Sequence, residues 1–239
     1  MSGIDVAEST WPEVSRRLAD GWPAVVPIGA ASKEHGRHLM LDTDFQQAQW
    51  IAARVRATRE VVVWPTVNYG YYPVFVDYPG SISLREETFV ALLSDILAGI
   101  AHAGAARVVL LNTGISTIAP LESLLRQRAQ RPPCKLVNVY AGAEFARVSA
   151  ALAEQRWGGH ADEIETSIML ALAPGRVRMS AARAAPVRIT RGRFNRTDPG
   201  APNYSPDGVN GDPTLASAAK GEALLAAMFA DVIAAFDAA

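Results

Sequence analysis

The chain has 239 residues, of which 49% are hydrophobic and 20% charged, and its formal net charge is −1. This length suits one large α/β domain or two small ones, and the composition is that of an ordinary globular protein. The near-neutral charge argues against binding to nucleic acid or to an anionic membrane through the whole surface. The single cysteine, Cys134, excludes a disulfide within the chain.

Neither end of the sequence predicts targeting to a membrane. The first ten residues include two acidic side chains and no apolar run, unlike a secretory signal. The apolar segment 215–236 is interrupted by Lys220, Glu222 and Asp231, so it does not have the pattern of a spanning helix. We therefore expect a cytoplasmic protein with no membrane partner.

Short apolar runs alternate with helical patterns along the chain. The predicted strands are 24–28, 60–64, 107–111 and 135–139. The predicted helices are 46–59, 85–102, 118–130, 161–172 and 215–236. This alternation is typical of right-handed βαβ units. We therefore predict a single α/β domain over residues 1–239, with a mainly parallel central sheet, helices on both faces, and an irregular excursion at about 176–213.

Ligands collect at the carboxyl ends of parallel strands, and the segment after the first predicted strand carries several candidate ligands. Residues 29–44 include Glu34, His35, His38, Asp42 and Asp44. Nitrogen and oxygen donors that converge on one point can bind a metal, and two glycines would let this backbone fold tightly. Alternatively, the segment is a polar surface loop in which Thr43 or Asp44 caps the next helix. Composition leaves both interpretations open.

A second candidate segment is 159–167, where His160 precedes a predicted helix and Glu163 and Glu165 lie in its first turns. A histidine beside carboxylates can act as a general acid or base. Acidic residues at this place also suit the helix dipole, which is the structural alternative.

Two further segments could contact a ligand. The aromatic segment 64–84, with Tyr69 and Tyr71, could line a substrate pocket or pack between subunits. A series of arginines could bind an anion, but a solvated arm or a subunit interface is the preferred interpretation. Too few lysines and aromatic residues accompany the series to predict a nucleic-acid partner. The series comprises Arg176, Arg178, Arg183, Arg188, Arg191, Arg193 and Arg196.

Five segments, in the same order along the chain, resemble conserved blocks of the creatininase family. Residues 35–44, HGRHLMLDTD, are similar to that family's Glu-x-His-Gly-Pro-His-Leu-Pro-Leu run followed by Thr-Asp. The resemblance extends from about residue 20 to 225. The other four segments are 69–70 with 78–84, then 108–121, 160–167 and 211–221.

This resemblance implies a hydrolase that cleaves a C–N bond in a cyclic or linear amide of a small molecule. It also implies a centre of two metal ions, zinc, manganese or iron, in a homo-oligomer that is commonly a hexamer. His35 and Asp44 match metal-ligand positions, with Asp44 at the bridging one. His160 matches the catalytic histidine, and Glu165 matches a conserved acid near the site.

Two departures from the family pattern affect the metal ligands. Lys33 stands where the family has its first glutamate ligand, and Gly114 stands where it has a histidine. Glu34 could replace the missing carboxylate if the backbone shifts, or the Lys33 ammonium could pair with Asp44 in place of a cation. Water, Glu34 or the Lys33 ammonium would fill the space left at Gly114. We expect one metal per chain rather than two, or none.

The leading hypothesis is therefore an amidohydrolase with a remodelled site. Glu34, His35, Asp44 and Glu165 are its candidate metal ligands, and His160 would relay a proton. One alternative is a metal-free protein that binds an anion or regulates a partner on the same scaffold. Another is a metal-free enzyme in which Lys33 is the nucleophile or base. The predicted substrate contacts are His38, Tyr69, Tyr71, Asn112, Thr113 and Ser116.

Overall fold

The structure is a computed structural model that describes residues 2–127, 132–186, 188–190 and 192–238. The described chain forms one α/β domain with a five-stranded, wholly parallel sheet in the order β1-β3-β2-β4-β5. The strands are β1 (Ile4–Asp5), β2 (Ala24–Ile28), β3 (Val62–Val63), β4 (Val108–Asn112) and β5 (Cys134–Asn138). The predicted fold class is confirmed.

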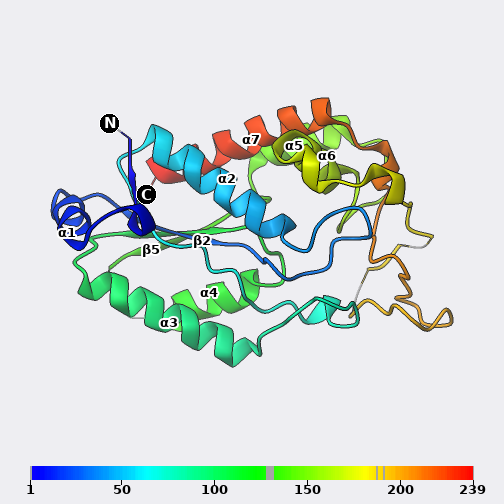
Figure 1. The fold of residues 1–239 in the computed structure, drawn as a ribbon, viewed down its shortest axis with the longest axis horizontal. Coiled ribbons are helices and arrows are strands. Elements are labelled where there is room, and N and C mark those ends of the chain that lie inside the picture. Colours follow the sequence, from blue (N-terminus) through cyan, green and yellow to red (C-terminus); the bar gives the residue numbers. More distant parts are fainter. Residues whose placement is uncertain (1, 128–131, 187, 191, 239) are drawn as a thin grey trace.

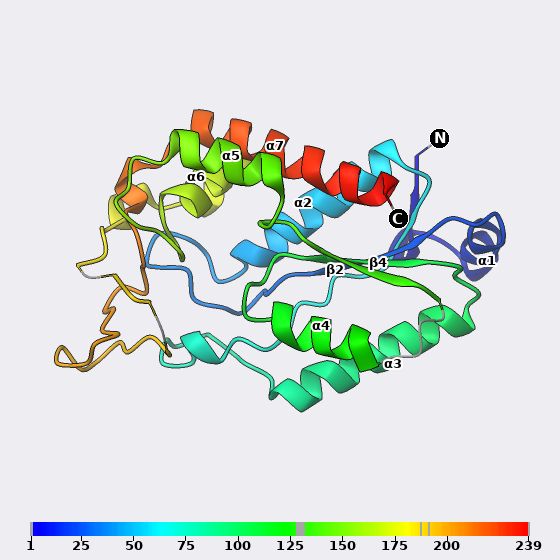
Figure 2. The same cartoon turned by 180° about the vertical axis from the view of Figure 1, so that it is seen from behind.

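Helices cover both faces of the sheet, as Figures 1 and 2 show. On one face, α2, α5, α6 and α7 enclose an apolar core with the outward side chains of β2, β4 and β5. On the other face, α1, α3 and α4 enclose a second core. The α-helices are α1 (Trp11–Ala19), α2 (Thr43–Thr58), α3 (Glu86–His102), α4 (Ile118–Gln127), α5 (Ala143–Leu152), α6 (Glu163–Leu172) and α7 (Ala218–Asp237).

The sequence explains which strands are central. Every residue of β2 and of β4 is buried, and a strand covered by helices on both sides needs apolar side chains on both faces. The predicted strand at 60–64 is shortened to Val62–Val63, and the last predicted helical residues, 128–130, lie outside the described residues. Among the described residues of 176–213, the regular elements are three-residue 3₁₀ turns.

The carboxyl ends of the strands meet at one end of the molecule, at the right of Figure 1. Segments 29–44, 112–117 and 159–167 come together there. Thr113 Oγ1 lies 3.1 Å from the carbonyl oxygen of Asp44, and His35 lies beside Glu165. Among the described residues, no helix is both long and apolar enough to cross a membrane.

Candidate functional site

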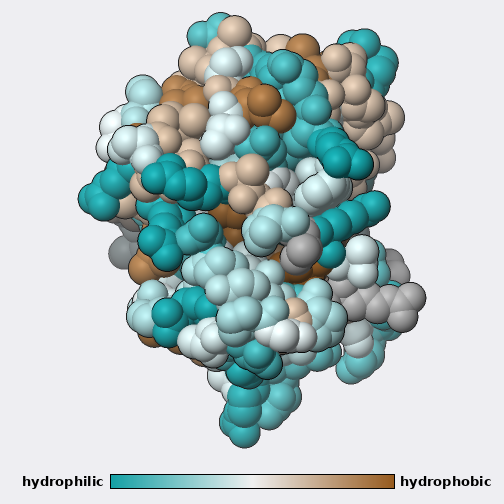
Figure 3. All heavy atoms as spheres, turned by 90° about the vertical axis from the view of Figure 1, so that its right-hand side faces the viewer, coloured by the Kyte–Doolittle hydropathy of each residue, from teal (hydrophilic) through white to brown (hydrophobic). Residues whose placement is uncertain are grey.

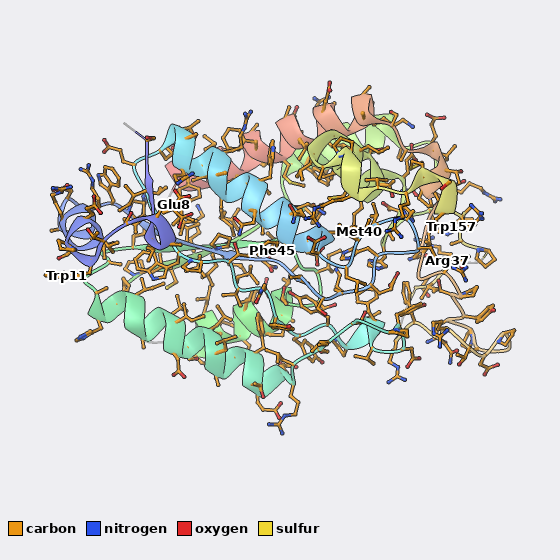
Figure 4. All side chains as sticks on the ribbon, in the orientation of Figure 1. Glu8, Trp11, Arg37, Met40, Phe45 and Trp157 are labelled. Atoms are coloured by element: carbon orange, nitrogen blue, oxygen red, sulfur yellow. The ribbon has the colours of Figure 1, made fainter. Side chains whose placement is uncertain are left out.

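The loop between β2 and α2 folds back on itself and so places His35 next to Asp44. The Lys33 amide donates to the carbonyl of Leu41 at 3.0 Å, and Gly36 adopts a left-handed conformation with φ of 73°. Figure 4 shows Arg37 and Met40 of this loop at the same end of the molecule as Trp157. Helix α2 begins at Thr43 with Asp42 at its cap position, so the alternative in which Thr43 or Asp44 caps this helix is wrong. Asp44 is instead free to turn towards His35.

His35 is fully buried, and each of its two ring nitrogens contacts an oxygen atom of the protein. Its Nδ1–H donates to the carbonyl of Lys33 at 2.9 Å. Its Nε2 therefore faces two carboxylates, Asp44 Oδ1 at 3.0 Å and Glu165 Oε1 at 3.6 Å. Burial and the Lys33 charge oppose protonation, but the two carboxylates outweigh them and raise the pKa of His35. A histidine that binds a metal through one ring nitrogen usually donates the N–H of its other ring nitrogen to a carbonyl or carboxylate oxygen.

His160 and Glu165 are positioned by the start of helix α6. Asp162 caps the helix by accepting from the amides of Ile164 and Glu165, and Ala161 takes a left-handed φ of 47°. The Ala161 amide donates to Glu165 Oε2 at 2.8 Å. Left-handed backbone at a residue other than glycine costs free energy and is common at functional sites. Here it turns His160 back towards the carboxylate of Glu165.

The ring of His160 is oriented by Glu34. Its Nε2–H donates to the carbonyl oxygen of Glu34 at 3.0 Å and to the Glu34 carboxylate at 3.1 Å. Its Nδ1 then faces Glu165 Oε2 at 3.9 Å. The other Glu34 carboxylate oxygen accepts from the Gly36 amide. The structure therefore places Glu34, a predicted metal ligand, behind His160.

His35, His160 and Glu165 form a cluster that could hold a metal ion. One donor atom from each lies within 4.8 Å of the others. Two imidazoles and one carboxylate suit zinc or manganese, and three protein ligands leave a position open, as in catalytic sites. This set differs from the predicted ligands: it includes His160 and does not include Glu34 or Asp44.

Lys33 forms a buried ion pair beside this cluster. Its Nζ lies 2.7 Å from Asp44 Oδ2, and both side chains are almost wholly buried. Lys33 also lies over the rings of Phe75 and Tyr72, at 5.1 and 5.6 Å from their centroids. Burial alone would raise the pKa of Asp44, but Lys33 and His35 outweigh it and lower that pKa. Of the two alternatives considered for Lys33, the structure shows the one in which its ammonium pairs with Asp44.

The space beside Gly114 is occupied by an aromatic ring. A Cβ atom at Gly114 would lie 2.7 Å from Thr117 Oγ1 and 3.2 Å from the ring of Tyr72. Asn112 fixes the loop, because its side chain donates to the Gly114 carbonyl at 2.7 Å and accepts from the Thr117 hydroxyl at 2.7 Å. Tyr72 was not among the groups expected to fill this space.

A cavity of about 600 Å³ opens beside the cluster. Lys33, Asp44, His160 and Glu165 lie in its wall. Most of the remaining wall is apolar, and Figure 3, which faces this end of the molecule, shows hydrophobic surface between the upper and lower halves. The apolar and small lining residues are Val74, Phe75, Ile115, Phe145, Ala146, Ala150, Ala153, Ile164 and Phe194.

Only two of the six predicted substrate contacts line this cavity, Thr113 and Ser116. His38 is fully buried and pairs with Thr166 Oγ1 at 2.8 Å, and Asn112 holds its own loop. Tyr69 is 45% exposed, and Tyr71 packs against the core on the α3 side. Phe75 and the exposed face of α5 line the cavity but were not among the predicted site residues. Phe75 was visible only as one of several aromatic residues in 64–84.

The arginine series does not reach the cavity within the described residues. Arg176 pairs with Asp42 at 2.6 Å, and Arg193 pairs with Asp77 at 2.5 Å. Pairing with acids elsewhere in the chain agrees with the preferred interpretation of this series. Arg191 lies outside the described residues.

Comparisons with known proteins identify related chains. The family model for creatininase, creatinine amidohydrolase, matches residues 7–236. A mycofactocin precursor peptide peptidase of Mycobacterium ulcerans (strain Agy99) is 31% identical, over 92% of this chain and 86% of that protein. A creatinine amidohydrolase of Pseudomonas putida is 31% identical, over 46% of this chain and 44% of that protein. A solved manganese creatininase superposes with a TM-score of 0.79 at 25% identity, covering 98% of this chain and 97% of that one.

Proposed function

Because the chain belongs to the creatininase family, we propose that it is a metal-dependent amidohydrolase with one divalent cation per chain. The chain has the creatininase amidohydrolase fold, and the related proteins are named as hydrolases of two kinds. The substrate that we propose is a small cyclic or linear amide.

The observation that carries the proposal is the convergence of His35, His160 and Glu165. Both histidines donate their outer N–H to fixed oxygen atoms, so their other nitrogens are directed at Glu165. A divalent cation held by these three residues would act as a Lewis acid and lower the pKa of a water molecule. A nitrogen that ligates a cation cannot also carry a proton. We therefore assign His160 to the ligands rather than to the proton relay.

The cavity supports an uncharged substrate with apolar substituents. Its wall is mainly apolar, whereas Lys33, Asp44, Asp162 and Glu165 are its charged members within the described residues. Binding pockets of this size take small organic molecules and orient them with a few polar groups. The metal-free anion-binding alternative is less well supported, because three of those four side chains are carboxylates.

The assembly and location remain predictions. We propose a homo-oligomer, a hexamer, on the basis of exposed apolar side chains in the aromatic segment, which include Tyr69, Val76 and Ile82. The cytoplasmic location rests on the sequence pattern alone.

Metal content and amide hydrolysis test the proposal together. Protein purified without chelator and loaded with zinc or manganese should hold about one ion per chain and hydrolyse members of a panel of small amides. Glu165→Gln keeps the side-chain shape and should lose both properties. Glu122→Gln, a control on the exposed part of α4, should lose neither. Wild-type protein that binds no metal, or Glu165→Gln with full metal content and activity, would contradict the proposal.

A further inference from the structure

A buried ammonium group lies at the junction between the metal cluster and the cavity. Lys33 Nζ is 2.7 Å from Asp44 Oδ2, while the other oxygen of Asp44 is 3.0 Å from His35 Nε2. Asp44 therefore connects the ammonium on one side to a candidate metal ligand on the other. A carboxylate that bridges two metal ions meets a cation with each oxygen, and here the ammonium of Lys33 occupies one of those two positions.

The ammonium has hydrogen-bonding capacity that the protein does not use. A lysine carries three N–H donors, and among the described residues Asp44 is the acceptor that Lys33 contacts. The faces of Phe75 and Tyr72 flank the group, and Lys33 forms part of the cavity wall. Aromatic faces stabilise a cation but accept no conventional hydrogen bond. Donors of Lys33 therefore remain available to a ligand in the cavity.

We propose that Lys33 is a catalytic residue whose ammonium takes the place of a second metal ion and stabilises the oxyanion of the substrate. This inference rests on the proposed amidohydrolase function. Lys33 donates a hydrogen bond to the carbonyl oxygen of the scissile amide as water adds to the carbonyl carbon and that oxygen becomes negative. The C–N bond then breaks, its electron pair goes to the nitrogen, and the nitrogen takes a proton that the water supplied. The products are a carboxylic acid and an amine, the acid passes its proton to the amine to give a carboxylate and an ammonium ion, and Lys33 keeps its own proton.

The surroundings of Lys33 favour a tethered cation over a second metal ion. Gly114 provides no side-chain donor on this side, and the Tyr72 ring and Thr117 fill the space that a side chain there would need. Asp44 is then left with Lys33 as its partner on this side. An ammonium on a side chain also stays in place when a chelator removes the metal. One divalent ion and one fixed positive charge would thus perform the work of two metals.

Substitutions at Lys33 test this role by activity, metal content and chemical rescue. Lys33→Met keeps the length of the side chain without its charge. It should keep about one metal per chain while kcat falls by about 10²- to 10³-fold, as when an oxyanion donor is removed. Lys33→Ala should lose similar activity and regain part of it with added ethylammonium, but not with ethanol, which matches its size without the charge. A residue needed only for packing would respond equally to both additives.

Metal stoichiometry separates this inference from the proposed function. If the wild type binds one metal but hydrolyses no amide, the proposed reaction is wrong. Lys33→Glu then still tests whether the Lys33 ammonium occupies the place of a second metal ion. This variant should take up more than one ion per chain in excess zinc. Near-wild-type kcat in Lys33→Met, two ions in the wild type, or unchanged metal content in Lys33→Glu would overturn the assignment of Lys33.

Discussion

Replacing His38 should change how the stability of the protein depends on pH. His38 is fully buried, its Nε2 pairs with Thr166 Oγ1 at 2.8 Å, and its Nδ1 has no hydrogen-bond partner among the described residues. Burial lowers the pKa of His38 to about 4, against an ordinary value of 6.5. The folded protein therefore holds this side chain neutral under conditions in which the unfolded chain would protonate it.

The sign and size of the effect follow from proton linkage. Between pH 6.5 and 4 the unfolded chain binds more protons at His38 than the folded chain does, so the free energy of unfolding falls as pH falls. Each unit of pKa difference corresponds to about 1.4 kcal/mol, so the loss should reach about 3 kcal/mol once the pH is near 4. Above pH 6.5 the contribution is fully present and constant.

Denaturant unfolding at pH 7.5 and 4.5 measures this contribution. Between these two pH values the free energy of unfolding should fall in both proteins. His38→Gln lacks the titrating group, so its fall should be smaller than that of the wild type by about 2 to 3 kcal/mol. His102→Gln, at the exposed end of α3, should behave like the wild type. Parallel pH dependences for wild type and His38→Gln would refute the reasoning. Unchanged pH dependence with reduced kcat/KM would instead favour the substrate contact predicted from the sequence.

Two further predictions concern the metal ligands and the cavity. Glu34→Ala should weaken metal binding about 10- to 100-fold in a chelator competition assay, because His160 loses the carboxylate that orients it, and Glu34→Gln, which keeps an oxygen acceptor, should lose less. Equal metal affinity in Glu34→Ala and the wild type would contradict this support role. Ala150→Leu should lower kcat/KM by about 10-fold or more for amides with bulky apolar groups and little for acetamide, because added carbons in an apolar pocket exclude substrate carbons. Ala151 lies on the same helix but outside the cavity wall, so Ala151→Leu should leave kcat/KM for both kinds of amide unchanged. Equal effects of the two substitutions would show that the α5 face does not contact substrate.

The elements that could be predicted from the sequence are those whose apolar runs stand out clearly from the polar segments around them. The runs at 24–28 and 107–111 are uninterrupted, and they become the fully buried central strands β2 and β4. Strand β1 has only two residues at the edge of the sheet, too few for a period-two pattern. Helix α5 is only ten residues long, half of them alanine or serine, and it has one buried side chain, Phe145, so few large apolar residues mark it in the sequence. The element that forms much of the cavity wall was therefore missed.

The site could be predicted as a set of residues but not as a set of contacts. His35 and Asp44 lie nine positions apart within one loop, and local folding brings them together at 3.0 Å. His160, and not Glu34, belongs to the metal-binding cluster because the two residues, 126 positions apart in the chain, contact each other. No local pattern indicates which of two neighbouring polar side chains turns towards a distant histidine. Glu34 turned to His160, and His160 turned to Glu165.

The departures at Lys33 and Gly114 and the position of Tyr72 depend on one another. A divalent cation placed about 4 Å from the Lys33 ammonium would be repelled by about 8 kcal/mol at an effective dielectric near 20. Replacing Lys33 by a carboxylate removes this repulsion but supplies no donor on the Gly114 side. A histidine at position 114 would bring its Cβ within 2.7 Å of Thr117 Oγ1 and 3.2 Å of the Tyr72 ring, so both neighbours would have to move. A tight second metal site therefore requires changes at Lys33, Gly114 and Tyr72 together, whereas Lys33→Glu alone should admit a second ion only weakly, in excess zinc.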